Sequence, residues 1–202
     1  MRQRRVTTVL LLLAMLLVGS VGQASAEQTL VFFRHGEKPA TDYHGQLSCQ
    51  GFNRALALPK VLLAKYGRPT YLYAPNPAFR ISDPGGRSYY DRALETLVPL
   101  GVKLKMDIRS QFGYTDIASL QHALIDPAKD DTLIFVAWEH LALQQLVQNI
   151  MNAYGGHLVV PQWPSTDYDS LFVVRVNYGS AVTASFQHDH EGLNGRPTAC
   201  GF

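Results

Sequence analysis

The sequence predicts an α/β protein, a three-layer α/β/α sandwich with a mainly parallel central sheet. Short apolar runs such as Leu30–Phe33 and Leu133–Ala137 indicate buried strands. Longer segments with apolar residues at helical spacing separate these runs, and strands that alternate with helices favour a parallel sheet covered on both faces. Neither an internal repeat nor a long linker divides the chain, so residues 27–202 are expected to form one domain.

Residues 1–26 have the pattern of a signal peptide. Three arginines within the first five residues precede an apolar run, and Ala24-Ser25-Ala26 supplies a small-residue cleavage site. An uncleaved membrane anchor is the alternative, but the apolar run is short for a spanning helix. We therefore expect a periplasmic or secreted protein that begins at Glu27 and keeps no stable membrane insertion after cleavage.

Removal of this segment changes the charge of the protein. The whole chain carries a net charge of +2, but residues 1–26 hold three basic and no acidic residues. The mature chain of 176 residues would have 15 basic and 16 acidic residues, a net charge of about −1. The composition therefore gives no indication of nucleic-acid binding, and the length suffices for one domain with a sizeable core.

The only two cysteines, Cys49 and Cys200, both lie in the mature chain. An even number of cysteines in an exported protein favours a disulfide, with two free thiols as the alternative. This disulfide would tie the C-terminal tail to the loop after the first strand. A zinc site is not expected, because neither cysteine has a Cys or His at ligand spacing.

The first strand is followed by a predicted loop, a helix and a second strand. Thr41–Gly51 is polar and rich in turn residues, and the apolar residues after it repeat at helical spacing. Pro59 should kink that helix. Tyr71–Ala74 indicates a short second strand.

A long loop and another helix are expected next. Pro75–Arg87 is rich in Pro, Gly and Ser, which predicts a loop, and long loops in small domains are often functional. Ser88–Leu100 has a helical pattern, with Ser88 as a plausible N-cap and Gly101 beyond its end.

The second half of the chain contains the clearest elements. Asp116 can cap a short helix, and a buried strand at Leu133–Ala137 precedes a helix with a regular apolar face. Leu171–Val176 supplies another strand. The tail after Tyr178 is polar and is assigned no element.

The main chemical motif is Arg34-His35-Gly36, directly after the first strand. In a parallel α/β sheet, ligands bind at the carboxyl ends of the strands. An arginine there can hold an anion against a nucleophilic imidazole, and glycine allows a sharp turn and a close approach to a ligand. His140 follows another strand, so both histidines are expected at the same edge of the sheet.

These residues resemble the histidine phosphatase superfamily, which includes acid phosphatases and phosphoglycerate mutase-like enzymes. The shared features are Arg-His-Gly after an N-terminal strand, an arginine in a helix about sixty residues later, and a late strand-end histidine, in the same order from Leu30 to about Tyr178. The resemblance implies a phosphoglycerate mutase-like fold for residues 27–202, a histidine phosphatase-like catalytic domain, and a reaction without metal or other cofactor.

The resemblance also implies roles for individual residues. His35 would be the catalytic nucleophile that takes the phosphoryl group, and Arg34 and Arg92 would clamp the phosphate, whose oxygens match guanidinium geometry. His140 would hydrogen-bond the transferred phosphate. Arg80 and Arg87 are the alternatives to Arg92.

The proton donor for the leaving group has several candidates in the sequence. Many relatives place a glutamate shortly before Phe-Gly, but the segment before Phe112-Gly113 contains no glutamate. Glu139, beside His140, is therefore the first candidate for the catalytic acid. The alternatives that remain are Glu37, Asp107 and Asp116.

Two other features allow more than one interpretation. Arg54 could reach the pocket, or it could be a solvated arginine on a helix. The segment His188–Glu191 contains two histidines and two acidic residues, but its irregular spacing favours a solvated tail over a metal site.

The sequence thus predicts an exported, metal-independent phosphatase that hydrolyses a phosphomonoester through a phosphohistidine. The partner would be a small-molecule or envelope phosphomonoester, with no nucleic acid. A phosphomutase is one alternative, which export disfavours. The other is a catalytically silent phosphate-binding or envelope-interaction module, which the missing glutamate favours.

Overall fold

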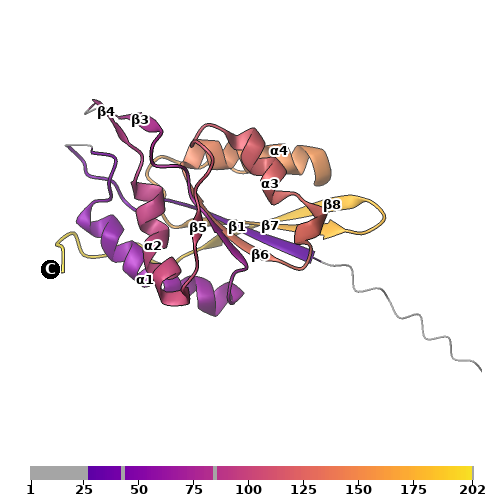
Figure 1. Cartoon of the computed structure of the whole chain (residues 1–202), viewed down its shortest axis with the longest axis horizontal. Helices are drawn as coiled ribbons and strands as arrows, with labels where there is room; N and C mark the ends of the chain where they lie inside the picture. Colours follow the sequence, from indigo (N-terminus) through magenta and orange to yellow (C-terminus); the bar gives the residue numbers. More distant parts are fainter. Residues whose placement is uncertain (1–26, 42–43, 84–85, 202) are drawn as a thin grey trace, which may run out of the picture.

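A computed structural model describes residues 27–41, 44–83 and 86–201. The expected signal peptide and its cleavage site lie outside these residues. Within them, a six-stranded sheet has the strand order β5-β2-β6-β1-β7-β8. Helices α1 and α2 lie on one face of this sheet, and α3 and α4 lie on the other (Figure 1). The expected three-layer α/β/α sandwich is confirmed.

The centre of the sheet is formed by the strands whose apolar runs are clearest in the sequence. These are β1 (Glu27–Arg34) and β6 (Leu133–Trp138), which pair in parallel. Strand β6 also pairs in parallel with β2 (Tyr71–Tyr73), which pairs in turn with β5 (Ile108–Arg109).

The other edge of the sheet is antiparallel. Strand β7 (Ser170–Tyr178) runs against β1, and β8 (Val182–His190) runs against β7. Strand β8 lies in the tail to which the sequence analysis assigned no element. Its side chains alternate between half-buried and exposed along most of its length, as expected for an edge strand with one face on the core.

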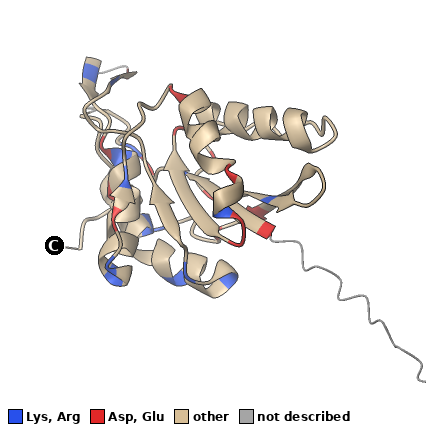
Figure 2. Cartoon of the chain, turned by 45° about the vertical axis from the view of Figure 1, so that its right-hand side comes forward, with Lys and Arg blue, Asp and Glu red and all other residues tan. Residues whose placement is uncertain are grey.

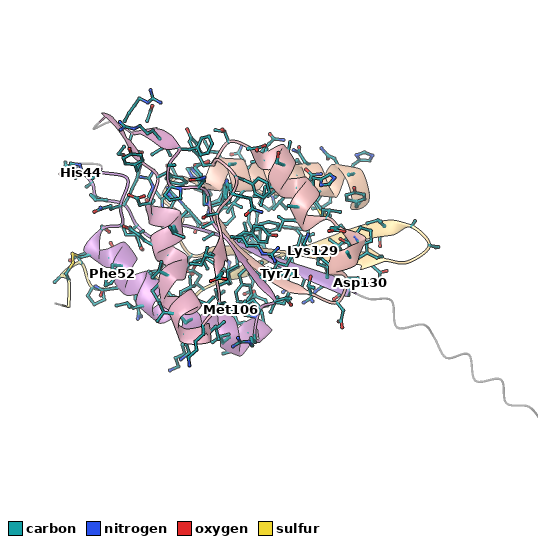
Figure 3. The ribbon with its side chains drawn as sticks, viewed as in Figure 1. His44, Phe52, Tyr71, Met106, Lys129 and Asp130 are labelled. Atoms are coloured by element: carbon teal, nitrogen blue, oxygen red, sulfur yellow. A yellow bond between two sulfur atoms is a disulfide. The ribbon has the colours of Figure 1, made fainter. Side chains whose placement is uncertain are left out.

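The apolar runs of β1 and β6 are continuous because both faces of the sheet are covered. In β1, Leu30 and Phe32 pack toward α3 and α4, whereas Val31 and Phe33 pack toward α1 and α2. Side chains fill the space between the sheet and each pair of helices (Figure 3). The core therefore holds the carboxyl ends of β1 and β6 at one fixed edge of the sheet.

Helices α3 (Ile117–Leu124) and α4 (His140–Tyr154) follow the predicted patterns. The side chain of Asp116 caps α3 by accepting from the Ser119 N–H, as expected. Helix α1 (Cys49–Tyr66) contains Pro59 and begins within the segment that was predicted as a loop. None of the helices in the described ranges is both long and apolar enough to cross a membrane.

Two predictions for residues 75–100 are wrong. The segment expected as a loop contains a small hairpin, β3 (Arg80–Asp83) and β4 (Gly86–Tyr89). Helix α2 runs from Arg92 to Leu104, so Ser88 belongs to β4 rather than to a helix cap, and Gly101 lies inside the helix. Short strands without an alternating apolar pattern explain the first error. The hairpin projects from the body of the domain beside α2 (Figure 1).

Candidate active site

One cavity of about 290 Å³ brings together the residues that the sequence predicted for the site. It lies at the carboxyl ends of β1 and β6, the place expected for ligands in a parallel α/β sheet. Its lining includes Arg34, His35, Arg92, Glu139 and His140. The remaining lining residues are Lys38, Ile81, Ser82, Asp83, Tyr114 and Leu141.

His35 is buried and held in one orientation by its neighbours. Its backbone N–H donates to the Trp138 carbonyl at 3.1 Å, which ties the end of β1 to the end of β6. Its Nδ1 lies 2.7 Å from the Gly36 carbonyl oxygen, so Nδ1 carries the proton and donates. The ring nitrogen Nε2 then keeps its lone pair, and the Arg92 Nε–H donates to it at 3.2 Å.

The surroundings keep the imidazole of His35 neutral. Burial lowers its pKa well below the ordinary value for histidine, and the nearby charges of Arg92 and Arg34 lower it further. A neutral imidazole with an unprotonated Nε2 is the form that can attack phosphorus, and the Arg92 N–H would first have to leave the Nε2 lone pair.

Gly36 is required for a reason that differs from the one expected. Its φ is not positive, and a Cβ at this position would lie 2.7 Å from the Gly51 carbonyl oxygen. The loop after β1 therefore passes close to the start of α1 at Gly36. The Gly36 N–H also donates to Thr96 Oγ1 at 3.0 Å, which anchors the loop after β1 to α2.

Arg92 is the first residue of α2, and its side chain reaches His35 on one side and a carboxylate on the other. Its Nη1 and Nη2 donate to the two carboxylate oxygens of Asp83 at 2.8 and 3.3 Å. Arg80 and Arg87, the alternatives considered for this position, are exposed on the hairpin and do not line the cavity. Basic residues mark the hairpin in Figure 2.

Arg34 is fixed by backbone carbonyls. Its Nη1 donates to the carbonyls of Ser165 and Asp167 at 2.6 and 3.1 Å, and its guanidinium lies over the Tyr168 ring at 3.9 Å. Its Nε is buried and has no hydrogen-bond partner in the described part of the chain. A buried cation with an unused donor in a cavity is suited to an incoming anion.

Glu139 and His140 join β6 to α4. The carboxylate of Glu139 caps α4 by accepting from the Ala142 N–H at 2.8 Å, and its Oε1 lies 2.5 Å from Nδ1 of His140. Burial favours the protonated form, but the contact with His140 and the Ala142 N–H outweigh it, so the pKa of Glu139 lies below its usual range. The expected acid is thus in the cavity, but its contacts hold it as a carboxylate.

The three alternative acids lie elsewhere. The carboxylate of Glu37 accepts from Arg54, Asp107 is exposed before β5, and Asp116 is exposed at the start of α3. None of them lines the cavity. Asp83, which does line the cavity, was not among the predicted acids, and its one signal in the sequence is its place in a long loop of the kind that is often functional.

Arg54 neither reaches this cavity nor faces solvent. It is fully buried and pairs with Glu37 at 2.7 Å, with Glu191 at 2.6 Å and with Asp169 at 3.2 Å. This network ties the loop after His35 to the segment that follows β8.

The segment His188–Glu191, for which a metal site and a solvated tail were the alternatives, is part of the folded domain. His188–His190 belong to β8, and Glu191 is buried, so the segment is not a solvated tail. In the described residues, no group of His, Cys, Asp and Glu side chains could hold a metal ion.

A larger hollow of about 560 Å³ lies between α1 and α2 beside the disulfide. Its described lining is mainly apolar and contains Glu95 but no Arg, Lys or His. Its described lining therefore offers neither an imidazole nor a cation, and the smaller cavity at His35 is the candidate active site.

Comparison with known proteins identifies the fold. No protein-family model and no curated protein matches the sequence. Solved structures do match. The histidine phosphatase SixA in complex with tungstate has a TM-score of 0.56 at 13% identity, over 81% of this chain and 97% of that one. The chain has the histidine phosphatase fold.

Two further matches belong to enzymes of the same superfamily. A phosphoglycerate mutase from Plasmodium falciparum has a TM-score of 0.53 at 12% identity, over 80% of this chain and 89% of that one. A mycobacterial glucosyl-3-phosphoglycerate phosphatase has a TM-score of 0.53 at 13% identity, over 79% and 96%. The structural similarity establishes the expected phosphoglycerate mutase-like fold, and because the identities are low the reaction has to be argued from the site.

Proposed function

We propose that the protein is an exported, metal-independent phosphatase that hydrolyses a phosphomonoester through a phosphohistidine at His35. The observation that carries this proposal is the buried imidazole of His35, which lines a cavity with two buried arginines and whose unprotonated Nε2 accepts a hydrogen bond from Arg92. Such a site supplies a nucleophile and two guanidinium groups for the charge on the phosphoryl oxygens.

Four residues of the cavity act in this mechanism. Nε2 of His35 attacks phosphorus, while Arg34 and Arg92 hold the equatorial oxygens. His140, at the start of α4, donates a hydrogen bond to the same phosphoryl group. Water then attacks the phosphorus of the phosphohistidine, and the imidazole returns to its neutral form.

Two features support the proposal that the protein is exported. Residues 1–26 have the composition of a signal peptide, and the Cys49–Cys200 disulfide is of the kind that persists in oxidising compartments. The substrate would then be a small-molecule or envelope phosphomonoester. Fractionation of cells that express the full chain, with detection of the cleaved form in the periplasm or medium, tests this part.

Replacement of the nucleophile tests the reaction itself. We expect His35→Ala to abolish turnover of p-nitrophenyl phosphate and to prevent trapping of acid-labile phosphate on the protein. His122→Ala is a matched control, because His122 is exposed on α3 away from the cavity. Both variants should keep the wild-type circular dichroism spectrum.

The contrary results are equally specific. Appreciable turnover by a well-folded His35→Ala variant would exclude the phosphohistidine mechanism. Tungstate or phosphate binding without turnover in the wild-type protein would instead favour the silent phosphate-binding module.

A further inference from the structure

We propose that Asp83, on the hairpin, is the catalytic acid that protonates the leaving oxygen. This inference rests on the proposed phosphatase function. It assigns to a residue of the hairpin a role that the sequence analysis gave to Glu139.

The geometry places Asp83 beside the reacting groups. Its carboxylate lines the same cavity as His35, and Arg92 lies between them, with Nε on His35 and both Nη atoms on Asp83. Lys38 also donates to Asp83 Oδ1 at 3.2 Å. A phosphoryl group held by Arg92 would therefore have the nucleophile at one end of the guanidinium and the carboxyl group at the other.

The hairpin is anchored to the domain close to Asp83. Ile81, two residues before Asp83, is buried against Tyr90 and Ala93 at the start of α2. Asp83 pairs with Gly86 at the end of the β3–β4 ladder. The carboxylate is thus carried by an ordered strand and lies almost wholly buried, with 6% of its side chain exposed.

Arg92 and Lys38, the cations that contact Asp83, are also the groups that a phosphate in the cavity would bind. Burial favours the protonated form of Asp83, but the hydrogen bonds and charges of Arg92 and Lys38 outweigh it and lower the pKa of Asp83. A phosphomonoester dianion in the clamp draws these cations away and adds negative charge nearby. Both changes favour the protonated carboxyl group, so Asp83 becomes an acid when substrate binds.

The donors that hold Glu139 as a carboxylate are not ones for which a bound phosphate would compete. Its carboxylate accepts from the Ala142 N–H at the positive end of α4 and contacts His140. These donors belong to the helix and stay in place when the cavity fills. We therefore assign Glu139 to the orientation of His140 and not to proton transfer.

The step balances with Asp83 as the acid. The Nε2 lone pair of His35 forms the N–P bond while the ester P–O bond breaks, and its electron pair moves to the leaving oxygen. That oxygen takes the proton of Asp83 and departs as a neutral alcohol. In the second step, water attacks phosphorus and gives its proton to the Asp83 carboxylate, and the N–P electrons return to Nε2.

Leaving-group dependence tests the assignment, because a nitrophenolate leaves without a proton and an alkoxide does not. We expect Asp83→Asn to reduce kcat/KM for glycerol 2-phosphate by roughly 10²–10⁴-fold and to affect p-nitrophenyl phosphate far less. Glu139→Gln, the matched control, should reduce both rates by a similar factor.

Inhibition by inorganic phosphate shows whether the clamp survives the substitution. We expect phosphate to inhibit the Asp83→Asn variant at least as strongly as the wild type, because Arg92 loses a competing anion. Equal losses on the two substrates, or weaker phosphate inhibition, would assign Asp83 to holding Arg92 and overturn the inference. A wild-type protein that hydrolyses neither ester would overturn the phosphatase proposal as well, whereas equal losses leave that proposal intact.

Discussion

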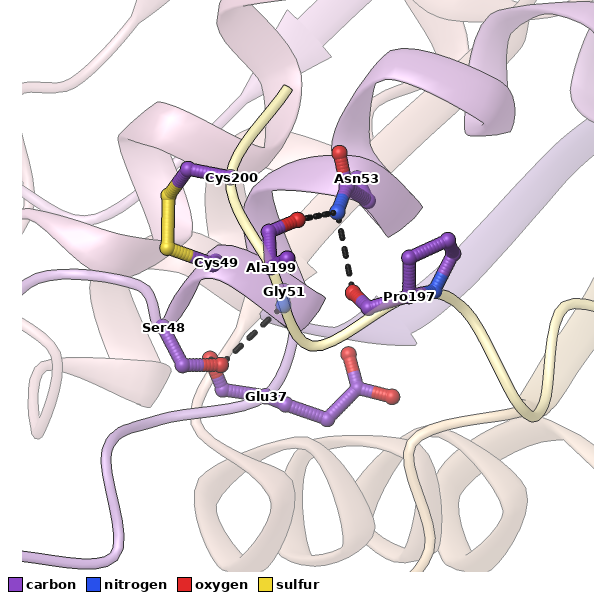
Figure 4. The surroundings of a disulfide bond; sticks show 8 residues. All are labelled: Glu37, Ser48, Cys49, Gly51, Asn53, Pro197, Ala199 and Cys200. Carbon is purple, nitrogen blue, oxygen red and sulfur yellow. Dashed lines mark hydrogen bonds between the residues drawn. A yellow bond between two sulfur atoms is a disulfide. The ribbon is translucent and has the colours of Figure 1, made fainter. Parts of the chain in front are cut away.

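Removal of the Cys49–Cys200 disulfide should destabilise the protein strongly. The bond joins the first residue of α1 to the C-terminal tail, 151 residues apart in sequence. Next to it, Asn53 Nδ2 donates to the carbonyls of Pro197 and Ala199, both at 2.9 Å (Figure 4). The tail therefore keeps two hydrogen bonds to α1 when the covalent link is lost.

The size of the effect follows from the length of the closed loop. A cross-link over 151 residues removes loop-closure entropy from the unfolded chain equivalent to about 5 kcal/mol at 25 °C. A domain of this size changes its Tm by roughly 2–4 °C for each kcal/mol, so Tm should fall by roughly 10–20 °C. The double variant Cys49→Ser/Cys200→Ser is the suitable change, because a single substitution leaves a reactive thiol.

Urea unfolding of the oxidised wild type, the reduced wild type and the double variant provides the assay. The last two should agree, and both should unfold at lower urea concentration. Their m-values should be larger, because an unfolded chain without the cross-link exposes more surface. A loss below about 1 kcal/mol with an unchanged m-value would refute the argument from the unfolded state.

Two other predictions concern the buried ion pairs of Arg54 and the contact between α1 and the loop that follows His35. Burial raises the pKa of Glu191 to about 8 against the opposing charge of Arg54, whereas the unfolded group titrates near 4.3. Between these two pKa values the folded protein binds a proton that the unfolded chain does not. The free energy of unfolding should therefore fall as pH rises from about 4 to about 8, and Glu191→Gln should remove this decline. Urea unfolding at several pH values measures this decline. Equal slopes of the free energy of unfolding against pH for the wild type and Glu191→Gln would contradict the prediction. A Cβ at Gly51 would lie 2.3 Å from the Glu37 carbonyl oxygen, so Gly51→Ala should cost roughly 1–3 kcal/mol and reduce kcat. Gly201→Ala, with open space around it, is the control, and equal kcat and unfolding curves for both variants would disprove the contact.

The sequence predicted those elements in which the local pattern of apolar residues matches the burial of the same residues in the fold. The runs in β1 and β6 are apolar at every position because the sheet is covered on both faces, and this identified the two central strands. The cap at Asp116 and the apolar face of α4 were equally clear. These elements fix the sheet edge at which His35 and His140 meet.

The hairpin could not be predicted because its strands contain little apolar pattern. Ile81 is the one buried apolar residue among the described residues of β3 and β4, and the segment between Pro75 and Arg87 is dominated by turn residues. The ladder depends on contact with the start of α2, which is a tertiary interaction. Asp83 was missed as a consequence.

Strand β8 and Arg54 were missed for different reasons. Half-buried positions alternate along β8 from Val182 to Phe186, so the pattern was present, although polar residues at its far end concealed it. The burial of Arg54 has no local signal at all. Its three carboxylate partners come from separate parts of the chain, and only the fold brings them together.

The two cavity arginines are held in ways that predict different behaviour. Arg34 donates to the backbone carbonyls of Ser165 and Asp167, which cannot take up a proton and so remain acceptors when a ligand binds. Arg92 rests on the carboxylate of Asp83, which can take a proton or yield its place to a phosphate. Arg34 is therefore a fixed donor and Arg92 an exchangeable one. Because the exchangeable partner is carried by the hairpin, changes there should alter both anion affinity and proton transfer, whereas changes beside Arg34 should alter anion affinity alone.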